Sequence, residues 1–119
     1  MNIFICGLGL IGGSIAKAVK AHTFHTVIGC DRDNAVCRAA VAEGAIDRAG
    51  SADDLASCDL VLVALYPDAA AAFVADNLSK FKPDAILVDT CGIKSEVAAK
   101  IAATVRGSGI RYIGGHPMA

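Results

Sequence analysis

The sequence predicts a doubly wound α/β fold, in which helices cover both faces of a mostly parallel sheet. Two observations carry this prediction. Short runs that are apolar at odd and even positions alike alternate with longer stretches of helical spacing, and the first run leads into a glycine-rich turn. A strand with two apolar faces is covered on both sides, which is typical of parallel sheets between helices. The length of 119 residues suits one domain, 1–119, and is too short for two.

Each expected strand is a short apolar run, and the strands are joined by the right-handed crossovers that a parallel sheet requires. The third strand depends on only two apolar residues, Ala45 and Ile46, whereas the others are better marked. In chain order, strands are expected at 3–6, 27–30, 45–46, 60–65, 85–88 and 111–113.

The expected helices lie between these strands. In the first helix, Ile11 and Ile15 begin an apolar series at helical spacing, and the later helices are rich in alanine, a strong helix former. Asp68 is expected to cap the third helix, because an aspartate side chain can accept a hydrogen bond from a free backbone N–H. Gly44 and Gly107 fit helix ends. The helices after the first are expected at 34–43, 68–80 and 94–106.

The composition favours a compact domain without a surface for nucleic acid or a membrane. Eleven basic and twelve acidic residues give a net charge of −1, and aromatic residues make up only 5%. This excludes a basic footprint and argues against a base-stacking surface. No apolar run reaches the roughly 18 residues that a membrane helix needs. The five cysteines are an odd number without a C-x-x-C pair, which indicates reduced thiols in the cytoplasm.

A G-x-G-x-x-G motif lies where the first expected strand meets the first helix. Gly7 permits a tight turn, Gly9 lets the backbone approach a pyrophosphate, and Gly12 allows close helix–strand contact. The pyrophosphate would bind the free N–H groups at the start of the helix, where Leu10 and Ile11 lie. The alternative is that the glycines serve only a tight strand–helix turn. The surrounding strand and helix favour a dinucleotide site.

The expected cofactor is NAD rather than NADP. Asp31 ends the second strand, 19 residues after Gly12. Its carboxylate suits hydrogen bonds from ribose hydroxyls and would repel a 2′-phosphate. Arg32 leaves NADP open, because its guanidinium could pair with a 2′-phosphate, stack on the adenine, or remain a solvated surface charge.

Residues after the later strands complete the expected site, since ligands of doubly wound sheets bind beyond the carboxyl ends of the strands. Tyr66, Pro67 and Thr90 are expected cofactor contacts on this ground. His116 lies at the same edge, and its ordinary pKa of about 6.5 suits a general base, although a polar surface role is an alternative. His22 and His25 lack further ligands nearby, so a solvated loop is expected there and no metal site.

Three segments resemble the nucleotide-binding domain of prephenate dehydrogenase or its relative arogenate dehydrogenase. They are Gly-Leu-Gly-Leu-Ile-Gly-Gly-Ser at 7–14, Asp-Thr-Cys-Gly-Ile-Lys at 89–94 and Gly-Gly-His-Pro-Met-Ala at 114–119, with Asp31 between the first two. The resemblance extends over all 119 residues and implies a Rossmann-type dinucleotide-binding domain. The last segment, combined with the second, is the specific part, and the first motif is generic.

The resemblance implies an enzyme of tyrosine biosynthesis that oxidatively decarboxylates prephenate or arogenate. In that family, hydride passes from the ring carbon that bears the hydroxyl to the nicotinamide of NAD. The matching histidine, His116, contacts that hydroxyl and takes its proton, and carbon dioxide leaves as the ring becomes aromatic. The protein has to hold donor and acceptor carbons in contact and remove one proton.

The chain departs from the family pattern in two respects. Many members have a serine that contacts the substrate where this chain has Gly92. The family also continues into a mostly helical domain that forms a homodimer and supplies a basic residue for the substrate carboxylate. That domain is absent from these residues, so a fragment without activity of its own is expected. Two alternatives stay open: the same half of another two-domain enzyme, such as a β-hydroxyacid dehydrogenase, or a non-catalytic NAD-binding module.

Overall fold

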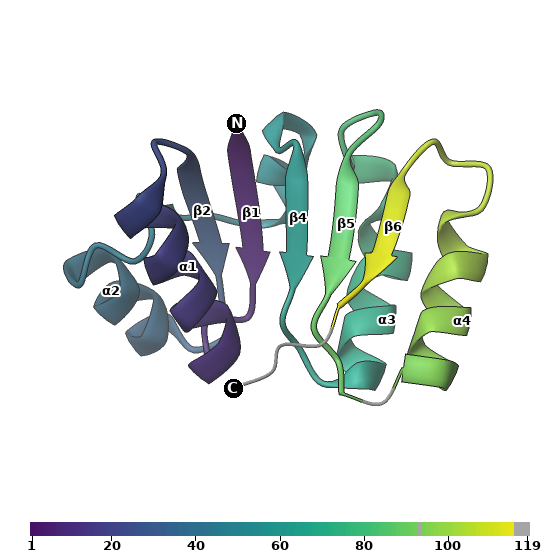
Figure 1. Ribbon diagram of the computed structural model, residues 1–119, viewed down its shortest axis with the longest axis horizontal. Helices are drawn as coiled ribbons and strands as arrows, with labels where there is room; N and C mark the ends of the chain where they lie inside the picture. Colours follow the sequence, from purple (N-terminus) through teal and green to yellow (C-terminus); the bar gives the residue numbers. More distant parts are fainter. Residues whose placement is uncertain (93, 116–119) are drawn as a thin grey trace.

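In the computed structural model, which describes residues 1–92 and 94–115, six parallel strands form one sheet with the order β3-β2-β1-β4-β5-β6 (Figure 1). The order reverses at β1, which has β2 on one side and β4 on the other. The sheet is therefore doubly wound, as predicted. The strands are β1 (Asn2–Cys6), β2 (Thr26–Cys30), β3 (Arg48–Ala49), β4 (Leu60–Val63), β5 (Ile86–Asp89) and β6 (Arg111–Gly114).

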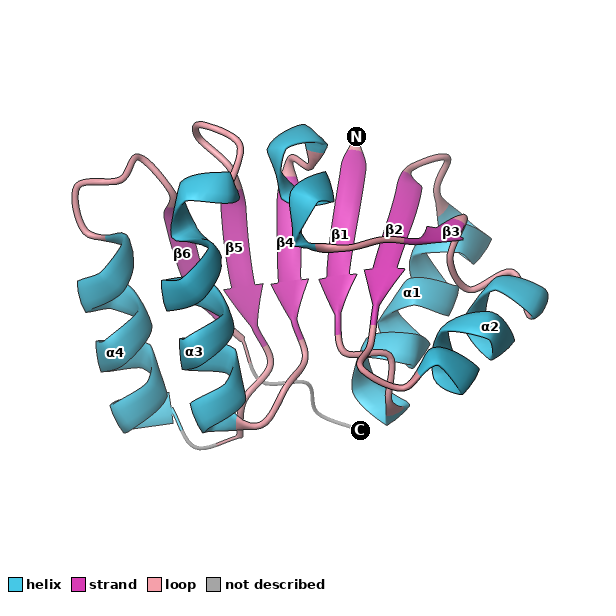
Figure 2. Ribbon diagram, turned by 180° about the vertical axis from the view of Figure 1, so that it is seen from behind, coloured by secondary structure: helices cyan, strands magenta, loops and turns pink. Residues whose placement is uncertain are grey.

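Four α-helices connect the strands and cover the sheet from both sides. Helices α1 and α2 pack on one face of the sheet. Helices α3 and α4 pack on the other face, which is turned towards the viewer in Figure 2. This division follows from right-handed crossovers that run outward from β1 in opposite directions. The helices are α1 (Leu10–His22), α2 (Asn34–Ala42), α3 (Pro67–Asn77) and α4 (Lys94–Val105), with the short 3₁₀ helices η1 (Ala52–Ser57) and η2 (Leu78–Lys80).

The core consists of two buried clusters, one on each face of the sheet. Successive residues of β1 alternate between them: Phe4 packs in the cluster that contains Val74 of α3 and Ile101 of α4, and Ile5 in the cluster that contains Ala16 of α1. Both β1 residues are 0% exposed. The apolar character at odd and even positions is thus explained, because each face of the strand has its own helical layer.

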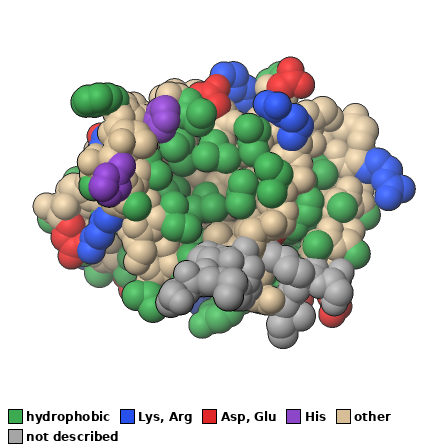
Figure 3. All heavy atoms as spheres, in the orientation of Figure 1, with side chains coloured by type: hydrophobic (Ala, Val, Ile, Leu, Met, Phe, Trp, Pro, Cys, Tyr) green, Lys and Arg blue, Asp and Glu red, His purple; other side chains and the backbone are tan. Residues whose placement is uncertain are grey.

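One part of the sheet remains apolar at the surface. Figure 3 shows hydrophobic side chains gathered on the face that α3 and α4 do not cover. Leu60, Ile86 and Val88 are only half-buried there, and Ile113 is 56% exposed. None of the helices in the described part of the chain is long and apolar enough to cross a bilayer.

Two sequence predictions of the fold were wrong in detail. The third strand is Arg48–Ala49, and Ala45 and Ile46 instead pack in the core, each 2% exposed. Their apolar character serves helix packing, whereas the real strand is an exposed two-residue edge. Helix α3 begins at Pro67 with Tyr66 as its cap residue, so Asp68 lies in the first turn and does not cap the helix as predicted. Proline suits the first helical position, because the N–H that it lacks would have no partner within the helix.

Candidate dinucleotide-binding site

The carboxyl ends of all six parallel strands lie along one edge of the sheet, the lower edge in Figure 1. The loops after β1, β2, β4 and β5 meet there. At β1 the chain crosses over in opposite directions, so the loops on either side diverge and leave a crevice. The structure thus brings the sequence-predicted residues of these loops to one edge. They are Gly7, Gly9, Leu10, Ile11, Gly12, Asp31, Arg32, Tyr66, Pro67 and Thr90.

Gly7 and Gly12 are required by the fold itself. Gly7 has φ +92°, and its N–H donates to the carbonyl of Cys30 at 2.8 Å. A Cβ on Gly7 would lie 2.3 Å from the carbonyl oxygen of Ala64, and one on Gly12 would lie 1.8 Å from the carbonyl oxygen of Gly7. Both distances are far below contact, so α1 can approach the turn only because these two side chains are absent.

Gly9 differs from these two, since nothing lies within 4 Å of a Cβ built on it. Its φ of −71° is open to any residue, and it precedes α1 as the cap, with no side-chain hydrogen bond to the helix. The first turn of α1 contains no acidic residue. The N–H groups that begin a helix have no partner within it and carry its partial positive charge. The turn therefore offers an anion open space at Gly9 and unpaired donors beside it.

Asp31 makes contacts that the sequence did not predict. Its Oδ2 accepts a hydrogen bond from the N–H of Leu8 at 2.9 Å, and its Oδ1 accepts one from the N–H of Asp33 at 2.9 Å. The carboxylate thus braces the glycine turn from the end of the neighbouring strand. Each carboxylate oxygen has two lone pairs, so both oxygens retain capacity to accept from a ligand. Arg32, beside it, is exposed.

On the other side of the glycine turn, the residues that follow β4 and β5 differ in their exposure. Tyr66 is 85% exposed at the start of α3, whereas Pro67 is half-buried. Thr90 is 8% exposed, and its N–H donates to the carbonyl of Val63 at 3.2 Å. His116 lies outside the described residues. A possible metal site, three or more His, Cys, Asp or Glu side chains together, is not found within 1–92 and 94–115.

The buried Asp89 and the half-buried Tyr112 form a pair at this edge to which the sequence analysis gave no role. Asp89 is 0% exposed; its Oδ1 accepts from the Tyr112 hydroxyl at 2.6 Å, and its Oδ2 from the N–H of Cys91 at 3.0 Å. Burial and, after it, the hydrogen bond to Asp89 raise the pKa of Tyr112 above its usual range. An acid directly after an apolar strand was the available signal, but its tyrosine partner lies on another strand.

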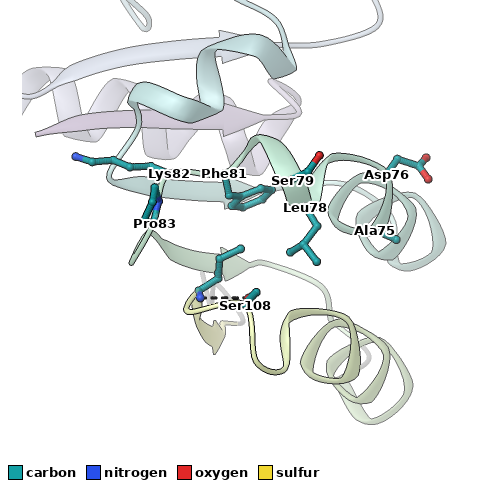
Figure 4. Close-up of a pocket in the computed structure, with 9 residues that line it drawn as sticks. Ala75, Asp76, Leu78, Ser79, Phe81, Lys82, Pro83 and Ser108 are labelled. Atoms are coloured by element: carbon teal, nitrogen blue, oxygen red, sulfur yellow. Dashed lines mark hydrogen bonds between the residues drawn. The ribbon is translucent and has the colours of Figure 1, made fainter.

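A hollow of about 500 Å³ lies away from this edge of the sheet (Figure 4). Its lining includes Leu78, Phe81, Lys82 and Ser108 and none of the predicted site residues. A smaller hollow of about 240 Å³ touches Gly9 and Leu10 between α1 and α2. Asp31, Tyr66 and Thr90 line neither of these two hollows, so hollow volume alone does not locate the site.

The fold and the glycine turn define a Rossmann-type dinucleotide-binding domain. Over residues 15–119 the chain matches the family described as prephenate dehydrogenase, nucleotide-binding domain, and it belongs to that family. The prephenate dehydrogenase of Bacillus subtilis is 32% identical over 121 residues, which is 99% of this chain and 33% of that protein.

Two solved structures show the same likeness. Arogenate dehydrogenase from Synechocystis superposes with a TM-score of 0.89 at 28% identity, over 98% of this chain and 41% of that one. Prephenate dehydrogenase from A. aeolicus, in complex with hydroxyphenyl propionate and NAD⁺, gives 0.86 at 25% identity, over 99% and 42%. This chain therefore spans between a third and just over two fifths of the length of these relatives.

Gly12→Ala should destabilise the domain by about 3 kcal/mol, the upper end of overpacking costs, because the new methyl group would meet the backbone of Gly7. The same change at Gly9 enters open space and should cost less than about 1 kcal/mol, the difference in capping preference. Urea unfolding followed by circular dichroism measures both. Equal losses for the two variants would contradict the distinction between the glycines.

Proposed function

We propose that this domain binds NAD(H) along the carboxyl edge of the sheet, as the cofactor-binding half of an enzyme that oxidatively decarboxylates prephenate or arogenate. The observation that carries the proposal is the open space at Gly9. The fold does not require a glycine there, whereas a pyrophosphate approaching the start of α1 would. Membership of the prephenate dehydrogenase family and the NAD⁺ bound by the A. aeolicus relative support the choice of cofactor and reaction.

The strand order assigns the two halves of the dinucleotide to opposite sides of the turn. Asp31 directly follows β2 and would receive the adenosine ribose, so the nicotinamide half would extend over β4 and β5. Tyr66 and Thr90 lie at the ends of those strands, and Leu10 and Ile11 cover the pyrophosphate from the start of α1. When bound, NAD⁺ accepts the hydride, and the protein holds it against the substrate.

Asp31 would favour NAD over NADP. Hydrogen bonds from the N–H groups of Leu8 and Asp33 hold the carboxylate in place, so that a negative charge lies where a 2′-phosphate would come. Like charges in contact are unfavourable, and two ribose hydroxyls can instead donate to the remaining lone pairs. The exposed Arg32 can compensate a phosphate only in part, so NADP should bind more weakly.

His116 would act as the general base. It directly follows Gly115, whose N–H donates to the carbonyl of Asp89 at 3.0 Å, so the chain leading to it is tied to the end of β5. A neutral imidazole can remove the proton of the substrate hydroxyl near neutral pH. Gly92 supplies no hydroxyl to the substrate. The homodimer contacts and the basic residue that pairs with the substrate carboxylate would come from the part of the relatives that this chain does not cover.

Gly9→Val should abolish NAD⁺ binding while the far-ultraviolet circular dichroism spectrum stays unchanged. The side chain would enter the space that the pyrophosphate needs, and its Cβ would touch no other part of the protein. Calorimetric titration with NAD⁺ measures the loss. A Gly9→Val variant that still binds NAD⁺ as tightly as the unaltered domain would rule out a pyrophosphate at this turn.

Asp31→Asn should lower the preference for NAD⁺ over NADP⁺ about tenfold, equivalent to about 1.4 kcal/mol, because the amide keeps an acceptor but loses the charge. Asp33→Ser is the matched control: it removes a neighbouring charge and keeps the cap of α2, since Asp33 accepts from the N–H of Ala35. Titration with both cofactors gives the ratio. Tighter binding of NADP⁺ by the unaltered domain would overturn the role of Asp31.

His116→Asn, made in the complete dehydrogenase, should lower kcat by about 10² to 10⁴, the usual contribution of a positioned general base. Asparagine can hydrogen-bond the substrate hydroxyl but cannot accept its proton. Activity of the unaltered enzyme should fall as the pH drops through the histidine pKa, and the variant should lack this limb. Near-normal turnover with the limb intact would place the base elsewhere.

A further inference from the structure

We propose that Asp89 is a positioning residue that holds the start of the loop after β5 and the end of β6 in one arrangement, and that this arrangement receives the nicotinamide half of the dinucleotide. Asp89 acts through the Tyr112 hydroxyl and the N–H of Cys91. The inference rests on the proposed function, since it assumes that a dinucleotide binds at this edge.

Residue 89 is bonded to three separate parts of the site. Its carboxylate accepts from Cys91 in the loop after β5 and from Tyr112 on β6, at 3.0 and 2.6 Å. Its backbone carbonyl accepts from the N–H of Gly115, beyond the end of β6, at 3.0 Å. Two strands and two loops therefore depend on one residue for their relative position. Fully satisfied buried networks of this kind hold their members rigidly.

The cluster lies where the fold alone does not require polar groups. Among the residues whose burial is described, Asp89 and Thr90 are the buried polar ones, and both lie at the carboxyl end of β5. Of the residues before them, Leu87 is in the core and Val88 is half-buried against the cluster on the other face. Removing a carboxylate from water is costly, and an apolar residue could fill the same space. The cost is understandable if the position of the two loops matters to a ligand.

The strand order connects this cluster to one end of the cofactor. Asp31 directly follows β2, on one side of the glycine turn after β1, and Asp89 ends β5, two strands away on the other side. With the adenosine ribose at Asp31, the nicotinamide half faces the loops that Asp89 holds. A defect in the cluster should therefore affect that half alone.

Comparison of two ligands tests this selectivity: NAD⁺, and ADP-ribose, which lacks the nicotinamide. In Asp89→Asn and in Tyr112→Phe, the affinity for NAD⁺ should fall about tenfold, as for a lost hydrogen bond to a charged group, and that for ADP-ribose should stay within about twofold. Tyr112→Phe removes one hydroxyl and keeps the buried ring, so it protects the test against misfolding of Asp89→Asn.

Asp59→Asn is the matched control. The Asp59 carboxylate accepts from the N–H of Asn2 and pairs with Lys82 at the opposite edge of the sheet, so its loss reports general destabilisation. Both ligands should bind this variant normally. Equal losses of NAD⁺ and ADP-ribose in the Asp89 and Tyr112 variants, or no loss at all, would overturn the positioning role. An unaltered domain that binds neither ligand would refute the proposed function, and the inference with it.

Tyrosine ionisation gives an independent signature, because the chain has two tyrosines and no tryptophan. Tyr112 should resist ionisation, because its burial and its hydrogen bond to Asp89 raise its pKa. Asp89→Asn should bring the Tyr112 transition to lower pH, measured by tyrosinate absorbance. A Tyr112 transition that stays at the same pH in Asp89→Asn would overturn the contact on which the inference depends.

Discussion

The close approach of α1 to the turn after β1 determines where the rest of the site lies. Gly12 rests against the carbonyl of Gly7, and Gly7 is in turn bonded to Cys30 and pressed against Ala64. These contacts join α1, β1, β2 and the end of β4 at the point where the strand order reverses. The start of α1 is thereby directed at the crevice between the diverging loops, and its free N–H groups with it.

The glycines of the motif therefore answer to two different constraints. Packing excludes a side chain at Gly7 and Gly12, whereas no other part of the protein excludes a Cβ at Gly9. Where the fold would accept a side chain and the sequence nevertheless has glycine, we infer that the space is needed by a ligand. The sequence pattern predicted the turn but could not separate these constraints, because the distances that separate them join residues on different strands, such as Gly7 and Ala64.

The strands and helices could be predicted wherever burial is two-sided. β1, β4 and β5 were predicted because a central parallel strand leaves an apolar signal at every position. β3 could not be, because Arg48 and Ala49 form an exposed edge whose only requirement is pairing with Ile28 and Gly29. Nothing in the pair itself marks it as a strand. Contacts between residues far apart in the sequence, such as Tyr112 with Asp89, produce no local sequence pattern from which they could be predicted.

The acids Asp31 and Asp89, after β2 and at the end of β5, illustrate how the loops at this edge of the sheet are held in position. Each accepts the N–H of a nearby loop, Leu8 in one case and Cys91 in the other, so each fixes a loop from the end of a strand. They differ in access: Asp31 is half-buried, and Asp89 is fully buried. A half-buried carboxylate can stabilise a turn and also accept hydrogen bonds from a ribose. A fully buried carboxylate can act on a ligand only through the groups to which it is hydrogen-bonded. The same chemistry thus serves recognition at one end of the crevice and positioning at the other.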